Sequence, residues 1–428
     1  MLKKILVLCL LLGLIGVIFA ERKVSIVTYF DVNPDATWPA ALGIWKVAEK
    51  FMQQRPDIKL EFVFIPFGEL VPQVMRWAMI GEGPDVIGLD NPDVLHAAAA
   101  GVYMDLTPRV KAWGQWEDFY LGYRVATTYK DKVYAIQFGT NNLALFYNKD
   151  IFDKYGLKPP KTWAELLDVC EKLKKYLEGT GMYPIGIAAV NTEELTFQFL
   201  PFLWSNNATL LELDTPQAVE ALKLWVTLLE KGYAPKDVLT WGQGADPLIG
   251  KQVAMMVNGP WIIPLLQQAG LNFGVAPLPA PKEGMPVIVP TGGETFGINV
   301  ACKDPDAAWE FIKFFVEPEN MAYFCSISYY VPCRASATKL VIEKQPILKV
   351  FAEQAIRALP RPQMGGEEHY TEVSAIARQY VQLALTKELS PEEAFKRAAE
   401  EIRNVFPTKQ AFEEAKKKAR QLLDQARK

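Results

Sequence analysis

The segment from Lys23 to Phe67 reads KVSIVTYF at 23–30, AALGIWKVAEKFMQQ at 40–54 and KLEFVFIPF at 59–67. The first and last runs are rich in β-branched and aromatic residues, which favours strands, whereas the middle run spaces its apolar residues as an amphipathic helix does. The order is therefore strand, helix, strand. This unit is typical of α/β proteins whose mainly parallel sheet is covered by helices.

The same alternation continues along the chain and starts again in a second α/β unit after Pro160. After Ala301 the pattern is helical nearly to the end, with polar caps before Pro305 and Pro391 that mark helix starts. We expect further strands at 85–89, 133–138, 143–148, 185–190, 253–257, 273–276 and 295–300. We expect further helices at 70–80, 163–176, 194–203, 216–230, 304–316, 390–405 and from 408 onward.

The N-terminus has the order of a secretory signal peptide, with Lys3 and Lys4 before an apolar run that ends at Ala20. The run is about 15 residues long, shorter than the roughly 20 that span a bilayer. We predict a signal peptide at 1–20 and a periplasmic or extracellular protein. Ile18 is large for its place before the cleavage site, so a membrane tether is the alternative.

The charge balance excludes polyanionic partners. The formal net charge is −3, and removal of the signal peptide makes it more negative. The one dense basic cluster, Lys416-Lys417-Lys418, lies in a helical tail mixed with acids, so no nucleic-acid partner is expected. The mature chain keeps four cysteines, and their spacing does not choose among three pairings: Cys170, Cys302, Cys325 and Cys333.

The sequence contains no motif for metal, nucleotide or acyl-transfer chemistry. His96 and His369 do not stand at metal-ligand spacing. A G-x-S-x-G elbow, a P-loop and a complete G-x-G-x-x-G are all absent from the sequence. We therefore expect no cofactor, no metal and no enzyme activity. A glycosidase needs only two carboxylates at the correct separation, and this alternative stays open.

Aromatic residues make up 12% of the chain and include 11 tryptophans. A pyranose packs its C–H face on an aromatic ring and offers hydroxyls to Asp, Glu, Asn, Gln and Arg, so this composition suits a sugar ligand. Tryptophans inside amphipathic helices are expected in the core: Trp45, Trp77, Trp163, Trp225 and Trp309. Those at loops or element ends are candidates for a binding cleft: Trp38, Trp204, Trp241 and Trp261.

Short motifs then recur in a familiar order: GPDV at 83–86, YNK at 147–149, PKTWAEL at 160–166, VNGPW at 257–261, GIN at 297–299 and SPEEA at 390–394. Together they resemble the family 1 extracellular solute-binding proteins, the maltose-binding-protein-like sugar receptors of ATP-binding-cassette importers. The resemblance covers nearly the whole mature chain. The four cysteines and a charged helix after Pro407 depart from the family pattern.

The resemblance implies an α/β, two-lobed periplasmic-binding-protein fold of type II, with the ligand cleft between the lobes. Three crossings join the lobes, near 137–142, 290–296 and 331–339. Lobe 1 then comprises 21–138 and the return segment 293–335, and lobe 2 comprises 139–292. The C-terminal helices at 336–428 are expected mostly with lobe 2.

The resemblance also implies ligand-binding residues. The loop after the first strand supplies Asp31, Asn33 and Trp38, and the loop after the GPDV strand supplies Asp90 and Asn91. The first crossing carries Asn141 and Asn142, the NGPW turn presents Trp261, and the second crossing carries Gly293 and Glu294. Trp204 and Trp241 complete the aromatic candidates, and the C-terminal half adds Tyr330, Arg334, Arg361 and Tyr370. Asp31 and Asn33 could instead shape an Asx turn, and Gly293 could serve only the backbone bend.

The function implied is binding without chemistry, in which a monomer captures a mono- or oligosaccharide and delivers it to a transmembrane permease. Two alternatives remain. One is a receptor for a charged solute, with Arg334 and Arg361 for an anion such as a phosphorylated polyol, or Glu294 with Asp31 for a cation such as a polyamine. The other is a secreted polysaccharide-active enzyme.

Overall fold

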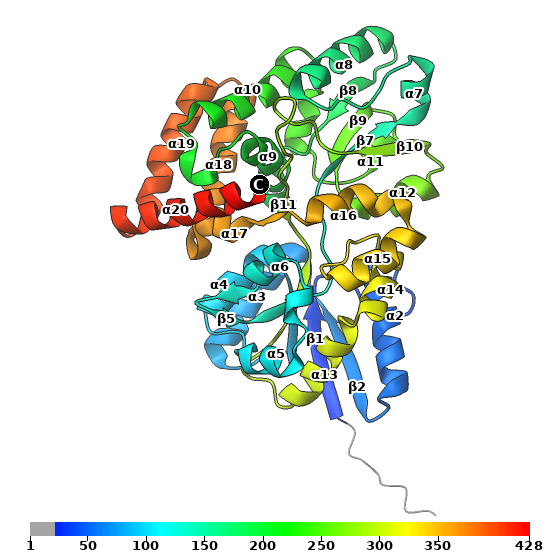
Figure 1. The fold of residues 1–428 in the computed structure, drawn as a ribbon, viewed down its shortest axis with the longest axis vertical. Coiled ribbons are helices and arrows are strands. Elements are labelled where there is room, and N and C mark those ends of the chain that lie inside the picture. Colours follow the sequence, from blue (N-terminus) through cyan, green and yellow to red (C-terminus); the bar gives the residue numbers. More distant parts are fainter. Residues whose placement is uncertain (1–21) are drawn as a thin grey trace, which may run out of the picture.

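The computed structural model describes residues 22–428, which form two α/β lobes joined by extended segments (Figure 1). The predicted signal peptide lies outside the described residues. Within 22–428, the helices are too short or too polar to cross a bilayer. The two-lobed fold predicted from the sequence is confirmed.

Lobe 1 is built on a five-stranded sheet in the order β2-β1-β3-β12-β6. β1 lies parallel to β2 and β3, whereas β12 runs antiparallel between β3 and β6. Because β12 follows lobe 2 in the sequence, lobe 1 is discontinuous. The strands are β1 (Arg22–Thr28), β2 (Ile58–Phe64), β3 (Val86–Asp90), β6 (Ala135–Gln137) and β12 (Glu294–Ile298), with a β4 (Thr128–Tyr129) and β5 (Lys132–Val133) hairpin beside them.

Helices cover both faces of this sheet because alternate strand residues point to opposite sides. Ile26 and Val86 face one core with α2 and α13, while Val27 and Ile87 face another with α3 and α4. The helices of lobe 1 are α2 (Pro39–Gln54), α3 (Phe67–Ile80), α4 (Val94–Ala99), α5 (Thr107–Trp113), α6 (Leu121–Ala126), α13 (Pro305–Phe315), α14 (Pro318–Ser328) and α15 (Ala335–Lys344).

Lobe 2 has a four-stranded sheet in the order β10-β7-β9-β8. Only β8 and β9 are parallel, so this sheet is more mixed than the strand–helix alternation predicts. The strands are β7 (Ala144–Asn148), β8 (Tyr183–Gly186), β9 (Val253–Asn258) and β10 (Phe273–Ala276). The helices are α7 (Lys149–Lys154), α8 (Trp163–Tyr176), α9 (Glu193–Ser205), α10 (Pro216–Glu230), α11 (Asp246–Ile249) and α12 (Ile263–Gln268).

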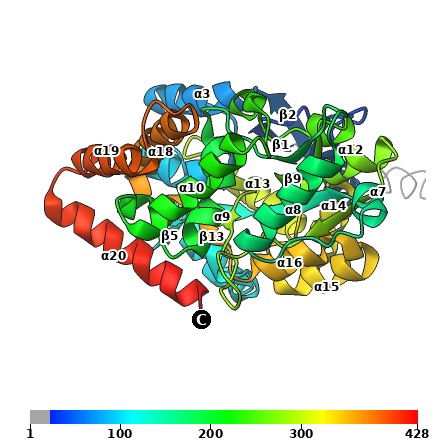
Figure 2. The ribbon, with the colours of Figure 1, turned by 90° about the horizontal axis from the view of Figure 1, so that it is seen from above.

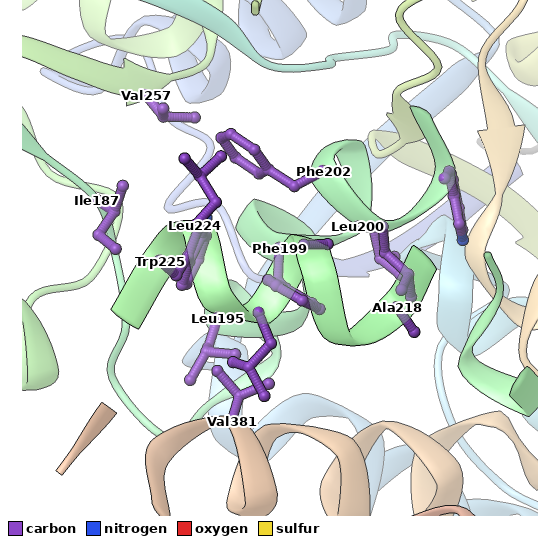
Figure 3. Packing of buried hydrophobic residues seen from close by; sticks show 14 of the residues in the cluster. Ile187, Leu195, Phe199, Leu200, Phe202, Ala218, Leu224, Trp225, Val257 and Val381 are labelled. Atoms are coloured by element: carbon purple, nitrogen blue, oxygen red, sulfur yellow. The ribbon is translucent and has the colours of Figure 1, made fainter. Parts of the chain in front are cut away.

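α9 forms the centre of the lobe 2 core, because every residue from Leu195 to Ser205 is buried. Figure 3 shows its side chains between those of α10 and α18. Trp225 of α10 meets Phe199 and Phe202 edge to face, with ring centroids 5.1 and 5.7 Å apart. A helix that is apolar on all sides is stable only when other elements surround it, which explains its place here.

The C-terminal helices pack mostly on lobe 2, and α18, α19 and α20 lie along one side of the molecule (Figure 2). α18 contacts α9 and α10, α19 contacts α10, and α20 contacts α17. Arg420 ties α20 to Glu212 and to the carbonyl of Asn207. These elements are α16 (Lys349–Ala355), α17 (Arg361–Met364), α18 (Tyr370–Leu385), α19 (Pro391–Val405) and α20 (Lys409–Ala426).

The segments that join the lobes lie side by side. Thr140 pairs with Val331, and Asn141 pairs with Gly292. Farther along, β11 (Pro290–Thr291) pairs with β13 (Leu359–Pro360). Val331 belongs to the third predicted crossing, and from there the chain continues into α15, which packs on α14 in lobe 1. α16 follows and contacts lobe 2, where the Phe351 ring lies 6.0 Å from that of Phe146 in β7.

The four described cysteines are all free thiols. Cys170, Cys325 and Cys333 are buried, and the Cys333 thiol donates to the carbonyl of Gln137 at 2.9 Å. The large cores explain why the fold does not depend on covalent cross-links.

Candidate functional site

A cavity of about 220 Å³ lies where the two lobes and the crossings meet; we call it the inner compartment. Its walls combine rings with carboxylates, amides and one guanidinium. Lobe 1 contributes Tyr29, Phe67, Asp90, Glu294 and Tyr330; lobe 2 contributes Glu193, Glu194, Phe197, Gln243 and Trp261; the connecting segments contribute Asn141 and Arg361.

A second cavity of about 420 Å³, the outer compartment, shares four aromatic walls with the first. The shared rings belong to Tyr29, Phe67, Trp261 and Tyr330. The outer compartment adds Phe30, Asp31, Trp38 and Phe64. Trp38, Phe64 and Phe67 are 41%, 49% and 56% exposed, so this part of the cleft is an open aromatic shelf.

The Trp261 ring is fixed by the turn that follows β9. A Cβ at Gly259 would overlap this ring, so only glycine lets the ring lie against the backbone there. The indole Nε1 donates to the carbonyl of Gln243 at 3.1 Å, and the Phe197 ring lies 6.4 Å away. Asn258 in turn donates to the carbonyl of Gly244 at 3.0 Å, which holds the loop that carries Gln243.

Arg361 links the two lobes inside the cleft. Its guanidinium donates to Asp90 of lobe 1 at 3.0 Å and to Glu193 of lobe 2 at 2.8 Å. It also lies 4.7 Å from the centre of the Phe197 ring. Burial by itself lowers the pKa of Arg361, but the charges of Asp90 and Glu193 outweigh burial and raise it, so the guanidinium stays charged. Burial also raises the pKa of Asp90, against the opposing charge of Arg361.

Glu193 is held on its other side by the C-terminal helices. The hydroxyls of Tyr370 and Ser374 both donate to its carboxylate, the latter at 2.6 Å. Arg378 approaches the same carboxylate at 3.9 Å. All three partners belong to α18, so Glu193 is anchored within lobe 2. The Arg361–Asp90 contact is therefore the one that spans the lobes.

Glu294 lies behind the aromatic wall and is 5% exposed. One carboxyl oxygen, Oε1, accepts hydrogen bonds from the hydroxyls of Tyr29 at 2.8 Å and Tyr330 at 3.0 Å. Burial and the nearby charge of Asp90 raise the pKa of Glu294 to about 8. The group is therefore largely uncharged at neutral pH.

Eight of the sixteen predicted site residues line the two compartments, and eight do not. The structure brings together Asp31, Trp38, Asp90, Asn141, Trp261, Glu294, Tyr330 and Arg361. It places the other eight outside: Asn33, Asn91, Asn142, Trp204, Trp241, Gly293, Arg334 and Tyr370.

Trp204, Arg334 and Asn142 are corrections to the predicted site. Trp204 is fully buried at the end of α9, so the prediction that its ring faces a cleft is wrong. Arg334 is 3% exposed and turns toward Asp118, to which it donates at 2.8 Å. Asn142 points away from the cleft and donates to the carbonyl of Phe351 at 2.9 Å, because successive side chains of an extended segment alternate in direction.

The remaining five residues outside the compartments have local roles. Asn33 accepts from the amide of Asp35 at 3.0 Å, the Asx turn given above as its alternative. Gly293 has a φ of 113° and donates its amide to Asp90, so it serves the backbone. Asn91 is buried and donates to Thr291, Trp241 packs on Gly186, and Tyr370 lies behind Glu193.

The sequence reasoning did not identify eight lining residues: Tyr29, Phe30, Phe64, Phe67, Glu193, Glu194, Phe197 and Gln243. Two signals were available. Tyr29 and Phe64 end or follow parallel strands, where ligands of open α/β sheets bind. Glu193 and Glu194 are the only charged residues of α9 and stand in its first turn, ahead of a buried and mainly apolar stretch.

The carboxylates of the cleft are already engaged. Asp90 and Glu193 pair with Arg361, and Glu294 accepts from two tyrosines. Among the described residues, no group of three His, Cys, Asp or Glu side chains is placed to hold a metal ion. The arrangement offers stacking surfaces with a fixed rim of donors and acceptors, which suits the capture of a polyhydroxylated molecule.

Comparison with known proteins agrees with this architecture. The profile of a family described as bacterial extracellular solute-binding protein matches residues 46–350. A maltotriose-binding protein of Pyrococcus abyssi is 28% identical over 331 residues, which cover 74% of this chain and 70% of that protein. A galactooligosaccharide-binding protein of Bacillus subtilis is 21% identical over 390 residues, 86% of this chain and 90% of that protein. The maltose-bound structure of T. maritima MalE3 superposes with a TM-score of 0.78 at 27% identity, over 90% of this chain and all of that one.

Proposed function

Because the chain belongs to the family of bacterial extracellular solute-binding proteins, we propose that it captures a carbohydrate between its lobes and presents it to the permease of an ATP-binding-cassette importer. The relatives named above bind maltotriose, galactooligosaccharides and maltose. The protein works by closure: a ligand shifts the lobes toward the closed form only by binding that form better than the open one.

The observation that carries this proposal is the pairing of aromatic walls with a polar rim. Trp261 and Tyr330 face both compartments, and Asn141 and Gln243 add amide groups to the inner one. Rings pack on the C–H faces of a sugar, amides both donate to and accept from its hydroxyls, and carboxylates accept from them. The ligand residues we propose are the predicted ones that line the compartments, except Glu294, together with Tyr29, Phe67, Phe197 and Gln243.

The charge of the cleft favours a neutral sugar over an anion. The inner compartment carries four carboxyl groups and a single guanidinium, which is already paired with Asp90 and Glu193. Arg334, the second cation that an anionic solute would need, is bonded to Asp118 away from the cavity. A phosphorylated polyol would meet repulsion here, since an anion gains no unpaired positive charge.

The two compartments also favour more than one sugar unit. The inner compartment carries most of the polar side chains of the cleft, whereas the outer one is lined by the exposed rings of Trp38, Phe64 and Phe67. We infer that one unit occupies the inner compartment and that further units lie along the aromatic shelf. The protein acts as an exported monomer, carried out of the cytoplasm by residues 1–20, and performs no chemistry on its ligand.

The test is a thermal-shift and calorimetry screen of the mature chain against maltose, maltotriose, mannotriose, galactooligosaccharides, glycerol 3-phosphate and spermidine. We expect an oligosaccharide to raise the melting temperature and to bind with a Kd between about 1 mM and 1 μM or tighter. Binding of glycerol 3-phosphate or spermidine without any sugar would contradict the proposal. Release of reducing ends from the bound oligosaccharide would show an enzyme instead.

A further inference from the structure

Resting on the proposed function, we propose that Glu294 is a positioning residue, which acts on the ligand through Tyr29 and Tyr330 by holding both rings with one carboxyl oxygen. Each ring lines both compartments, so each faces the sugar wherever it sits in the cleft. The three residues come from separate parts of the chain. Tyr29 follows β1, Glu294 begins β12 and Tyr330 follows α14.

Two hydrogen bonds fix the backbone of Glu294. Its amide donates to the carbonyl of Gly139 at 3.1 Å, and its carbonyl accepts from the amide of Phe138 at 3.0 Å. These bonds tie β12 to the first crossing. A Cβ at Gly139 would crowd the Phe324 and Tyr330 rings, so this glycine leaves the space in which Tyr330 stands. The backbone of Glu294 is thus held in place next to the first crossing.

The two rings depend on this point for their orientation. Tyr29 meets Phe67 edge to face at 5.0 Å, and Tyr330 meets Phe324 edge to face at 5.7 Å. Ring packing leaves a tyrosine free to tilt, whereas the hydroxyl bonds to Glu294 Oε1 fix the direction of each ring axis. Removing the acceptor would leave the hydroxyls of the buried Tyr330 and the partly buried Tyr29 without this partner and release both walls together.

The second carboxyl oxygen, Oε2, is buried and has no hydrogen-bond partner among the described residues. A carboxylate in this position would carry an unsatisfied charge, so the neutral acid is the favoured form, in agreement with its raised pKa of about 8. A sugar that fills the inner compartment removes water from this region and favours the neutral form further. Ligand binding should therefore take up a proton at Glu294 when the pH is near 8 or above.

Other titratable groups lie near Glu294, and their titrations must be distinguished from that of Glu294. Asp90 lies opposite on β3, and Asp93, whose pKa burial and Asp90 raise to about 7, follows it. Cys325 of α14, Tyr29 and Tyr330 also face Glu294, but burial raises the pKa of each of these three groups well above its usual value. Asp93 titrates lower, so a change between pH 7.5 and 9 that disappears in an E294Q variant belongs to Glu294.

The experiment measures maltotriose affinity of the full mature chain from pH 6 to 9 for the native protein, E294Q and E294L; the tightest-binding sugar of the panel replaces maltotriose if needed. Glutamine keeps an acceptor for both tyrosines, so E294Q should bind within about threefold of native at pH 7, whereas E294L should lose about tenfold or more. Native affinity should fall above pH 8, by up to about tenfold for each unit by which the sugar raises the pKa. E294Q should show no such fall.

A Y29F/Y330F double variant tests whether Glu294 acts through the two hydroxyls. In that background E294L should cost little further affinity, since residues that act as one unit are not additive. If E294Q loses as much affinity as E294L, the carboxyl group contacts the sugar itself and the proposal is wrong. The proposal is also wrong if the native protein and E294Q share one pH profile.

A measurement without ligand tests the positioning role independently of the proposed carbohydrate binding. With fluorotyrosine incorporated, the resonances of Tyr29 and Tyr330 should shift with a midpoint near pH 8 in the native protein and stay constant in E294Q. Failure of every sugar to bind would overturn the carbohydrate receptor but not the positioning role. Unchanging native resonances would overturn the positioning role whatever the sugars do.

Discussion

Gly259 lies directly under the indole ring of Trp261, so close that a Cβ at Gly259 would overlap the ring. The ring is therefore held on one side by backbone and on the other by the Nε1 bond to Gln243. Its position in the cleft is set by a residue that itself offers no side chain to a ligand.

Gly259→Ala should displace the Trp261 ring and weaken sugar binding. Because the new methyl group and the ring cannot occupy the same space, we expect a loss of at least about fivefold in affinity. Calorimetry with the sugar identified in the screen measures this loss. Gly284→Ala, which lies outside both compartments, is the control: its φ of 79° strains an alanine and lowers stability, but the affinity should stay unchanged. Unchanged affinity in Gly259→Ala would show that the ring moves without cost.

Trp261→Ala should reduce affinity by about tenfold or more while leaving the fold intact, because the ring stacks at the cleft and is only partly buried. Titration calorimetry and a thermal melt on the same sample separate the two effects.

Trp225→Ala is the matched control for Trp261→Ala. Trp225 is fully buried between Phe199 and Phe202, so its removal should lower the free energy of unfolding by about 3–5 kcal/mol. Denaturant unfolding measures this change. A fully stable Trp225→Ala, or a Trp261→Ala that unfolds, would reverse our assignment of core and cleft.

Asp90→Asn should both destabilise the protein and weaken binding. The substitution leaves the buried guanidinium of Arg361 with Glu193 as its remaining ion-pair partner, which we expect to cost about 2–4 kcal/mol. Chemical denaturation measures the cost. Asp31→Asn, at an exposed carboxylate of the outer compartment, should leave the unfolding free energy unchanged. Equal stability of both variants would show that the Arg361–Asp90 pair contributes nothing.

Glu294 should make the protein less stable as the pH rises. Its folded pKa of about 8 lies above its usual value of 4.5, so between these values the folded state holds a proton that the unfolded state has lost. The free energy of unfolding should then fall by up to about 1.4 kcal/mol per pH unit, and full stability is present only below the unfolded pKa. Denaturant melts from pH 4.5 to 8.5 measure the slope. An E294Q variant with the same slope would assign it to other groups.

The two-lobed fold could be predicted because strand and helix patterns, caps and motif order agree. Thr162 accepts from the amide of Glu165 at 3.2 Å and Ser390 from that of Glu393 at 3.2 Å, and both helices begin where the sequence indicates. The lobe on which each later helix packs is harder to predict. α15 packs on α14 in lobe 1 and α16 contacts β7 in lobe 2, and neither helix carries a local sequence signal for its lobe.

Only half of the predicted site residues line the cleft. The sequence does not show in which direction a side chain points or how deeply it is buried. Asn141 and Asn142 are the same residue type side by side, yet the backbone points one into the cavity and the other toward Phe351. Trp204 precedes a polar turn and therefore suggests an exposed ring, but α9 is buried to its last residue. Both errors concern tertiary surroundings, which single residues and their chain neighbours do not encode.

The position of β12 in the sequence determines when the sheet of lobe 1 can be completed during synthesis. This strand fills the gap between β3 and β6, so lobe 1 cannot close its sheet until the ribosome has passed Ile298. A shorter chain keeps β3 and β6 as open edges, and long-range pairing of this kind is slow. The N-terminal half therefore has an incomplete sheet until the segment that follows lobe 2 in the sequence has been added.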